Sequence, residues 1–573
     1  MSLPISTEKL SEPRGVLRRS GAVGGSALLA GGAVGSALLM SLFASPAGAV
    51  TTFTVDTNAD GVANASDCVT PVANSCSLRD ALAAATTDGD IIVFDAALSG
   101  QIITLSQGQL EITAGITITG LGSANLTVDA ASISRVFYIS TAPTGVEVAI
   151  SGISIINGVT GDYGGGVYDN HSGDLTLNDV SITGCDASYG GAVYKDGDGT
   201  LEIVESTISD NYASSSAGAL YNNGVGDLII TNSTFDGNAA ADDGGVGELG
   251  NDGNVTIVGS TFSNNYANGN GGAFYISSDV TGDVSISGSS FIDNESTGGG
   301  GAIYAENSGS FTVTSSTFSG NVSGSWGGAL YLGSFGQVVT VTDSLFADNY
   351  ASSEGGAIDS DEADQIVTIN NSTFVGNSSG SDGGAIWKEE GGSLTINMST
   401  ITENSATSGG GVWFTSSGTT VDVTITGTIL SGNTETGGAA DDLNTSGQYS
   451  PTVTISDSIL GVVDADITVT ASNNIDATAP GFVLGLSALA DNGGATETMA
   501  LIAGSPAIDA GPATVPTFTG NGFDQRGTPY VRVYNGQSDI GAFEVQPGPE
   551  PEPTPSTTTT VAPSEPVVPA FTG

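Results

Sequence analysis

The sequence predicts an all-β protein built as a parallel β-helix, and three observations indicate this fold. A Gly-Gly-Ala-like block recurs eleven times, first at Gly164 and last at Gly437, at spacings of 26 to 29 residues. An apolar residue three positions before an Asn recurs with the same period. Between these marks β-branched residues alternate with polar ones, which indicates short strands, and residues 150–445 hold no helix-length pattern. A fixed period of this length is the sequence signature of a solenoid.

Each period can hold three short strands and three turns, so we expect about 11 regular coils of 26–29 residues with three strands per coil. Successive coils stack at the spacing of neighbouring strands, about 4.8 Å, so equivalent residues lie above one another. Phenylalanines at one position are expected to form an internal stack: Phe235, Phe262, Phe291, Phe318, Phe346 and Phe374. Asparagines at the second mark are expected to form a hydrogen-bonded ladder: Asn211, Asn238, Asn265, Asn294, Asn321, Asn349, Asn377, Asn404 and Asn433. Cys185 holds this place one period earlier and is expected to be a small buried residue.

The two marks together, Gly-Gly-Ala-(Ile/Leu/Val) and Phe-x-x-Asn, resemble the repeat pair of the chlamydial polymorphic outer membrane proteins and of other bacterial surface β-helix proteins. The resemblance covers roughly residues 150–445. It implies that the β-helix is right-handed, which the periodicity alone does not determine. Its motifs are specific for the fold and carry little information about activity.

Residues 1–49 are predicted to be a signal peptide. Arg14, Arg18 and Arg19 give a basic start, an apolar run follows over residues 21–43, and the segment ends in the small-x-small pattern Ala-Gly-Ala at 47–49. We therefore expect a protein that is extracellular, either secreted or attached to the cell surface. No other segment is long and apolar enough to span a bilayer, so no membrane span is expected in the mature chain.

Residues 50–150 are predicted to form an N-terminal cap and irregular first coils. The string Cys-Ser-Leu-Arg-Asp-Ala from Cys76 begins a short helix with Ser77 as its N-cap. This string resembles the CSLREA motif of secreted bacterial β-helix proteins, with Asp80 where the motif has Glu. Cys68 and Cys76 lie eight residues apart in an exported protein, which predicts a disulfide between them.

The repeats are expected to occupy residues 151–450, and residues 451–545 are expected to form a C-terminal β cap. Three strings, "LADNGGATETMALIAGSPAIDAG", "FDQRGTPYVR" and "SDIGAFE", resemble the choice-of-anchor Q domain of bacterial surface β-helix proteins. Within them, Arg526 is expected to join a buried network with Asp509, Asp524 and Asp539. Residues 546–573 are rich in Pro, Thr and Ser and are predicted to be a disordered linker.

The charge balance excludes several classes of partner. The chain has 10 Lys plus Arg against 61 Asp plus Glu, for a formal net charge of −51. Phosphate binding needs clustered basic residues, so neither nucleic acid nor an anionic membrane surface is an expected partner. Hard cations such as Ca²⁺ fit the excess of carboxylates.

One segment matches the spacing of an EF-hand-like calcium loop. Asp56, Asn58, Asp60, Gly61 and Asp67 stand at loop positions 1, 3, 5, 6 and 12 of "DTNADGVANASD". The oxygen-bearing side chains of this set would be the metal ligands. Against this interpretation, position 12 is Asp rather than Glu, and no helical pattern precedes the loop. Ca²⁺ is the one cofactor that the sequence suggests.

The densest group of acids in the repeats is Asp359, Asp361, Glu362 and Asp364, which are the candidate catalytic residues if the protein is an enzyme. Paired carboxylates can hydrolyse a glycan when they are held about 5–10 Å apart. The competing interpretation places these side chains in hydrophilic turns as a solvated acidic edge. Basic residues that a lyase would need are scarce, and the only histidine, His171, is expected to be incidental.

Taken together, the sequence predicts an acidic β-helix protein with a non-catalytic role in adhesion, surface structure or glycan contact. The expected partners are cell-surface glycans, a cell wall, or the surface of a host or neighbouring cell. The alternative is a polysaccharide-degrading glycoside hydrolase or lyase that uses carboxylates on a lateral groove of the β-helix. A groove with carboxylates from adjacent coils would favour the alternative.

Overall fold

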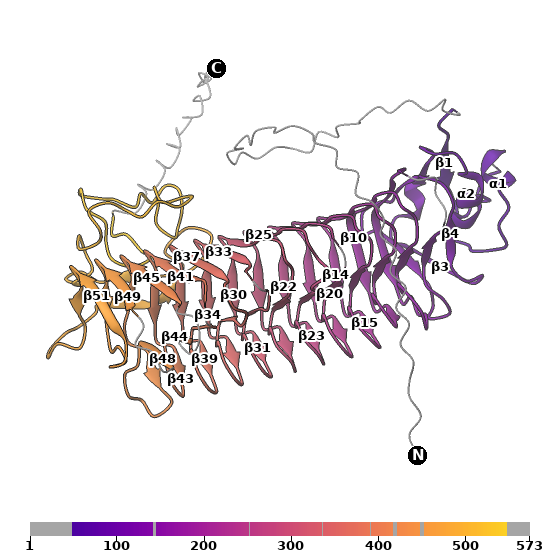
Figure 1. Ribbon diagram of the computed structural model, residues 1–573. Helices are drawn as coiled ribbons and strands as arrows, with labels where there is room; N and C mark the ends of the chain where they lie inside the picture. Colours follow the sequence, from indigo (N-terminus) through magenta and orange to yellow (C-terminus); the bar gives the residue numbers. More distant parts are fainter. Residues whose placement is uncertain are drawn as a thin grey trace, which may run out of the picture. The chain divides into compact units, whose positions relative to one another are not determined.

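The structure of the protein is a computed structural model that describes residues 49–546, apart from residues 71, 141–144, 251, 335, 390, 416–420 and 447–451. All the described residues belong to one compact unit. Most of the predicted signal peptide and of the predicted C-terminal linker lies outside the described residues. The described unit is a stack of β-coils that runs from the indigo N-terminal cap to the orange last coils in Figure 1.

One coil shows how the chain winds. It crosses sheet A in two short strands, β29 (Phe311–Thr314) and β30 (Thr317–Ser319), then sheet C in β31 (Val322–Ser323) and sheet B in β32 (Leu330–Leu332). The chain then enters β33 (Val338–Thr342), which pairs in parallel with β29. The prediction of three strands per coil is therefore correct in counting three sheets. The strand in sheet A, however, is divided in two by a kink, which in this coil lies between β29 and β30.

Sheet A is the largest of the three sheets. Its irregular first strands are β1 (Thr52–Val55), β2 (Ile91–Phe94), β3 (Gln101–Thr104), β5 (Thr117–Thr119), β6 (Leu126–Asp129), β8 (Val148–Ile156) and β10 (Leu175–Thr183). The strands before the kink in each regular coil are β13 (Leu201–Val204), β17 (Leu228–Thr231), β21 (Val255–Val258), β25 (Val284–Ser287), β29, β33, β37 (Ile366–Asn370), β41 (Ser393–Asn397), β45 (Asp422–Thr426), β49 (Thr452–Ser456) and β51 (Thr468–Ser472). The strands after the kink are β14 (Thr207–Ser209), β18 (Thr234–Asp236), β22 (Thr261–Ser263), β26 (Ser290–Ile292), β30, β34 (Leu345–Ala347), β38 (Thr373–Val375), β42 (Thr400–Thr402), β46 (Ile429–Leu430), β50 (Ile459–Leu460) and β52 (Ile475–Asp476).

Sheets B and C complete each coil. Sheet B comprises β4 (Leu110–Ile112), β7 (Phe137–Ile139), β9 (Val167–Asp169), β12 (Val193–Lys195), β16 (Leu220–Asn222), β20 (Gly247–Leu249), β24 (Phe274–Ile276), β28 (Ile303–Ala305), β32, β36 (Ile358–Ser360), β40 (Ile386–Lys388), β44 (Val412–Thr415) and β48 (Leu443–Ser446). Sheet C comprises β11 (Asp186–Ala187), β15 (Tyr212–Ala213), β19 (Ala239–Ala240), β23 (Tyr266–Ala267), β27 (Glu295–Ser296), β31, β35 (Tyr350–Ala351), β39 (Ser378–Ser379), β43 (Ser405–Ala406) and β47 (Thr434–Glu435). Sheet B has 13 strands among the described residues, because two irregular coils precede those that carry the repeat.

The interior of the stack contains the expected phenylalanine column. All six rings are fully buried, and the centroids of Phe318 and Phe346 lie 4.9 Å apart with nearly parallel planes. The asparagines form a ladder in which Asn321 Nδ2 donates to Asn349 Oδ1 over 2.9 Å and to the Phe291 carbonyl over 3.0 Å. Because each coil supplies the same atoms at the same place, the ladder amides are paired with their neighbours from coil to coil.

A second polar ladder explains why sheet A is kinked. Serines at the kink are buried, and each hydroxyl accepts from the backbone N–H of the equivalent serine one coil earlier, as Ser344 Oγ does from Ser316 N at 3.2 Å. The same hydroxyl donates to the Thr342 carbonyl two residues back at 2.8 Å. The residue before the serine has positive φ, for example Asp343 at 54°. This serine ladder has no counterpart among the predictions made from the sequence.

The last repeat block departs from the predicted register. Gly437 is exposed and does not precede a sheet B strand directly, since β48 begins only at Leu443. Asp442 takes over as the end of the asparagine ladder, and its Oδ1 accepts from Asn433 Nδ2 at 2.8 Å. A carboxylate suits the end of the ladder because it accepts the hydrogen bonds of Asn433. Unlike an asparagine amide, it has no N–H group that would need an acceptor in a further coil.

The N-terminal cap contains the predicted short helix, α2 (Leu78–Ala84), beside α1 (Ser66–Val69) and the 3-10 helix η1 (Ala96–Leu98). Ser77 and Asp80 form a capping box, in which each side chain bonds the backbone N–H of the other. The predicted disulfide between Cys68 and Cys76 is present.

The C-terminal segment folds back along the flank of the last coils. It carries the antiparallel pair β53 (Leu486–Ala490) and β54 (Thr498–Leu501), and the rest is irregular. Thr373 Oγ1 of β38 donates to Gln525 Oε1 at 2.6 Å, and Thr400 Oγ1 of β42 accepts from Ala542 N at 3.0 Å. In Figure 1 this yellow segment lies beside the coils of β37 to β51. The flank of sheet A is thus covered along several coils.

Candidate functional site on the outer face of sheet B

The middle residues of the sheet B strands form a continuous column along the coils. We call it the outer column of sheet B, because the residues on either side of each member are buried in nearly every coil. Its members pair in register from strand to strand and are Glu111, Tyr138, Tyr168, Tyr194, Tyr221, Glu248, Tyr275, Tyr304, Tyr331, Asp359, Trp387, Trp413 and Asn444.

Aromatic rings fill most places of the outer column and stack on one another. The ring centroids of Tyr304 and Tyr331 are 4.3 Å apart at an interplanar angle of 14°. Those of Trp387 and Trp413 are 5.6 Å apart at 8°. Tyr194, Tyr331, Trp387 and Trp413 are only 6–8% exposed and the other rings of the column are half-buried, so only part of each ring can meet a ligand.

A second row of side chains lies beside the outer column. It consists of the residues that directly precede the Gly pair of each coil, among them Tyr163, Tyr189, Trp326, Glu354 and Asp382, and we call it the loop row. Its aromatic members reach the surface, since Tyr163 is 39% and Trp326 is 43% exposed. The Trp326 ring lies 6.0 Å from that of Tyr331 in the outer column.

The aromatic order of the outer column is broken first by Glu248. Tyr221 Oη donates to Glu248 Oε1 over 3.2 Å, so this carboxylate has a partner within the column. Burial, opposed by hydrogen bonds from Ser216 and Tyr221, raises the pKa of Glu248 above its ordinary value. Glu248 is therefore a satisfied member of the column.

The second break, Asp359, is different. Asp359 is 0% exposed, and neither of its carboxyl oxygens has a hydrogen-bond partner in the part of the chain that the structure describes. Burial, with the nearby acids Asp361, Glu354 and Glu389, raises the pKa of Asp359 well above its ordinary value. The expectation that this residue lies on a solvated turn is wrong, because Asp359 occupies the centre of β36 between two rings.

The other three acids of the predicted group do not lie in the column. Asp361 Oδ2 accepts a hydrogen bond from Tyr331 Oη over 2.7 Å. Glu362 and Asp364 are exposed in the turn after β36, as the solvated-edge interpretation predicts. The structure thus joins only Asp359 and Asp361 to the aromatic rings. The charge of Glu354, which was not among the predicted residues, also raises the pKa of Asp359.

The two lysines of the repeats are buried in the interior of the coils. Lys388 Nζ donates to the Glu389 carbonyl over 2.8 Å, and burial lowers the pKa of Lys388 to about 8. Lys195 Nζ lies 3.1 Å from Asp169 Oδ2 and also donates to two backbone carbonyls. Neither ammonium group faces outward, so neither offers a base or an anion-binding group to a ligand on sheet B.

His171 is not the incidental turn residue that the sequence predicts. It is 2% exposed, its Nδ1 bonds Asp169 Oδ1, and its Nε2 lies 3.1 Å from the Val146 carbonyl. With Lys195 it forms a closed network inside the coil corner. Because every member is buried and bonded to its neighbours, this cluster supports the fold and offers nothing to a substrate.

The proposed calcium ligands are held apart by other partners. Asp56 accepts from the backbone N–H groups of Asn74 and Cys76, and Asp60 is paired with Arg79 at 2.7 Å. Asp67 lies in helix α1 rather than in a loop that wraps a cation. The Asn58 amide donates to the Ile102 carbonyl. In the part of the chain that the structure describes, no three His, Cys, Asp or Glu side chains form a group that could hold a metal ion.

The C-terminal network differs in detail from the prediction. Asp524 pairs with Arg526, whose guanidinium lies between the rings of Tyr530 and Phe543, each 3.8 Å from its Cζ. Asp539 instead accepts from the Asp509 backbone N–H, at 2.7 Å. These charge-assisted hydrogen bonds and ring contacts therefore join residues of the irregular C-terminal segment to one another.

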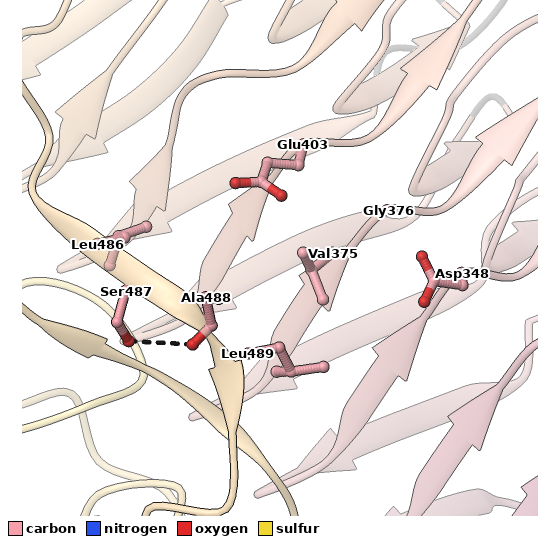
Figure 2. Close-up of a pocket in the computed structure, with 8 residues that line it drawn as sticks. All are labelled: Asp348, Val375, Gly376, Glu403, Leu486, Ser487, Ala488 and Leu489. Atoms are coloured by element: carbon pink, nitrogen blue, oxygen red, sulfur yellow. Dashed lines mark hydrogen bonds between the residues drawn. The ribbon is translucent and has the colours of Figure 1, made fainter.

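Figure 2 shows a hollow of about 340 Å³ between β53 and the flank of sheet A. Val375, Leu486 and Leu489 form its apolar part, and the carboxylates of Asp348 and Glu403 lie toward opposite sides. Both acids are exposed, and the other lining residues carry no basic group. The hollow is an opening beside the folded-back segment rather than an assembled catalytic site.

The sequence contained a signal for the outer column. The ten members from Tyr168 to Trp413 each stand four residues after the start of their block, so Asp359 in "GGAID" and Trp387 in "GGAIW" are equivalent. The tyrosines and tryptophans can be aligned in this way, whereas the prediction grouped Asp359 with its neighbours in the chain. The serine ladder also has a signal in the sequence, since a Ser stands two residues before the Phe of most repeats, as at Ser316, Ser344 and Ser372. Glu354 holds the same place before its Gly pair as Trp326. The hydrogen bonds that these residues make or lack depend on contacts between coils and could not be predicted from that signal.

Comparison with known proteins agrees with this architecture. The family model of the right-handed beta helix region matches residues 165–346 and 218–400. The fold is a right-handed parallel β-helix. Among solved structures, the crystal structure of pectate lyase Pel9A is similar at 12% identity over 87% of this chain and 98% of that chain, with a TM-score of 0.27. This likeness carries no inference about activity. The curated proteins contain no match to the chain.

No helix among the described residues has the length and apolar character needed to cross a bilayer.

Proposed function

We propose that this protein is an exported β-helix of the cell surface or surroundings that contacts glycans without catalysis, through the outer column of sheet B and the loop row. The observation that carries the proposal is the run of aromatic rings along successive coils, stacked and buried or half-buried in the outer column and exposed in the loop row at Tyr163 and Trp326. Sugars have apolar ring faces and hydroxyl rims, so rings beside carboxyl groups can contact both parts.

The charge of the chain supports an uncharged or cationic partner. A formal net charge of −51 opposes approach of polyanions at long range. The exported, surface-bound location is part of the proposal and rests on the predicted signal peptide. A role in adhesion or surface structure then follows from an elongated glycan-contacting face.

The experiment is a glycan array probed with the secreted protein, together with variants Tyr168→Ala and Trp326→Ala. We expect wild-type protein to bind a subset of glycans and each variant to bind about 3- to 10-fold more weakly, as loss of an aromatic contact of about 0.5–1.5 kcal/mol implies. The expected control is Tyr350→Ala, which removes an exposed ring on sheet C and leaves glycan binding unchanged. An array without any bound glycan would contradict the proposal.

A hydrolase is the second candidate, and one observation favours it. Asp359 has a pKa raised by burial and by neighbouring acids, and Asp361 lies close enough to contribute to that rise. A carboxylic acid beside a carboxylate is the pair that glycoside hydrolysis uses. Release of reducing ends or unsaturated products that is abolished by Asp359→Asn and by Asp361→Asn would establish this candidate. Binding without turnover would support the non-catalytic role.

A further inference from the structure

Three side chains on two neighbouring coils of the outer column and the loop row carry buried polar atoms that have no partner among the described residues. They are both carboxyl oxygens of Asp359, Oε2 of Glu354 and Nε1 of Trp387, and none has a hydrogen-bond partner in the described part of the chain. Asp359 and Trp387 face each other in register on β36 and β40. Glu354 is close enough to Asp359 to raise its pKa.

Leaving such atoms unpaired is unfavourable. A buried polar group without a partner destabilises a fold by about 1–3 kcal/mol, more when it is charged. The other acid among the rings of the column, Glu248, has a hydrogen-bond partner within the protein, because Tyr221 donates to it. The chain therefore keeps two acids and an indole N–H at the coil of Asp359 and the next coil, where apolar residues would fold better, which indicates that they have a partner outside the fold.

Aromatic surface adjoins these atoms on the preceding coil. Trp326 is 43% exposed and lies 6.0 Å from the Tyr331 ring, and Tyr331 is the neighbour of Asp359 in the column. Tyr331 is held in place by its hydrogen bond to Asp361. An exposed ring beside hydrogen-bonding groups of both kinds, acceptor and donor, is the arrangement that a sugar residue needs.

We propose that one sugar residue of a bound glycan occupies a subsite formed by Trp326, Tyr331, Glu354, Asp359 and Trp387, an inference that rests on the proposed function. The sugar ring stacks on Trp326, its hydroxyl or amino groups bond the carboxyl groups of Asp359 and Glu354, and one of its oxygens accepts from Trp387 Nε1. Asp359 is fully buried, so the sugar reaches it when a neighbouring side chain turns aside. Trp326 is exposed and Glu354 is half-buried.

The same surroundings decide the class of glycan. Asp361, Glu354 and Glu389 all act on Asp359, whereas the nearest lysine, Lys388, has its ammonium buried and bonded to a backbone carbonyl. An acidic sugar would bring its carboxylate among these acids without a cation to pair with it. The subsite therefore takes glycans whose sugars are neutral or carry an amine, and it rejects polyuronates.

The test measures affinity and stability together in matched variants. Isothermal titration uses hexamers of glucose, of deacetylated glucosamine and of galacturonate as probes, and the melting temperature is recorded for each protein. Asp359→Leu is expected to weaken binding of the first two probes about tenfold or more, because hydrogen bonds are lost, and to raise the melting temperature. Trp326→Ala is expected to weaken binding with little change in stability, since the ring is exposed.

Asp236→Leu on sheet A, away from the outer column and the loop row, is the matched control. It removes a carboxyl group that accepts hydrogen bonds from Ser263 and Asn264, so it is expected to lower the melting temperature and to leave affinity for all three probes unchanged. Binding of the galacturonate hexamer as tightly as the neutral one would overturn the proposal. So would unchanged affinity in both Asp359→Leu and Trp326→Ala.

The design separates this inference from the proposed function. If Tyr168→Ala weakens glycan binding while the Trp326 and Asp359 variants bind normally, the outer column contacts glycans and the subsite is wrong. If no glycan binds the wild-type protein, both proposals fail.

Discussion

At the scale of single residues, the same amino acid has different consequences on different positions of the coil. Asparagine inside the coil is fully buried and saturated with hydrogen bonds, as at Asn321. Asn268, in an exposed loop, makes two long contacts of 3.3 Å, one from its Nδ2 to the Ala241 carbonyl and one from Tyr266 Oη to its Oδ1. Period and position within the period, rather than residue type, decide whether a polar side chain supports the fold.

Substitution of a ladder asparagine should therefore be costly. Asn321→Ala removes the acceptor used by Asn294 N and Nδ2, at 3.1 and 3.0 Å, and leaves these buried donors unpaired. At about 1–3 kcal/mol for each such group, we expect the free energy of unfolding to fall by about 3 kcal/mol or more. Urea denaturation followed by circular dichroism measures the change. Asn268→Ala is the control and should stay within about 0.5 kcal/mol of wild type.

At the scale of elements, the folded-back C-terminal segment depends on polar contacts more than on strands. Its core is small, and Arg526 supplies much of its order by bonding Asp524 and the Glu544 carbonyl while lying between two rings. A planar guanidinium can make these contacts simultaneously, whereas an ammonium cannot.

Arg526→Lys is accordingly expected to loosen this segment while the coils stay folded. Lost charge-assisted hydrogen bonds and ring contacts amount to about 2–3 kcal/mol. Hydrogen exchange should accelerate at residues 524–545 and remain slow at the asparagine ladder. Glu497→Gln, at an exposed position of the same segment, should leave exchange unchanged. Equal acceleration in the coils and the segment would show that the two unfold together.

The contact between this segment and the flank of the coils should also depend on pH. Burial raises the pKa of Asp343 to about 7, with Asp524 adding to the rise and a hydrogen bond from Asn371 and the charge of Arg532 opposing it. The folded state therefore binds a proton at pH values where the unfolded chain, with a pKa near 3.8, has lost it. The stabilising contribution is complete below about pH 4 and is lost as pH rises toward 7.

Asp343→Asn tests this expectation. Asn tolerates the positive φ of 54° found at this position, and Asn371 holds the equivalent place in the next coil. The melting temperature of the wild type should fall between about pH 4 and pH 7, and the variant should show a smaller fall over the same range. Because Glu544 also has a pKa raised by burial to about 7, some pH dependence should persist in the variant. Identical profiles for the two proteins would exclude Asp343 as a contributor.

At the scale of the whole molecule, the sequence predicted contacts that recur in every coil, and it did not predict the contacts that occur at one place only. The period, the phenylalanine stack and the position of Asn321 could be predicted because each coil repeats the same contacts. The environment of Asp359 could not, since its burial comes from rings on the coils before and after it. The C-terminal segment was delimited from its strings, but its course along the flank depends on single contacts such as Thr373 to Gln525.

Repetition also implies that a whole coil is removable. Asn211 donates to Asn238 across an interval of 27 residues, and Asn238 to Asn265 across the same interval. Deletion of residues 219–245, which spans one such period, should bring Asn211 directly onto Asn265 with every ladder and stack in register. The shortened protein is expected to unfold cooperatively and to lose about 4.8 Å of length by small-angle scattering, one inter-strand spacing. Deletion of residues 219–231 alone breaks the period, places core residues on the outer face, and should give a protein that fails to fold. A full-coil deletion that unfolds like the partial one would show that the coils are not interchangeable units.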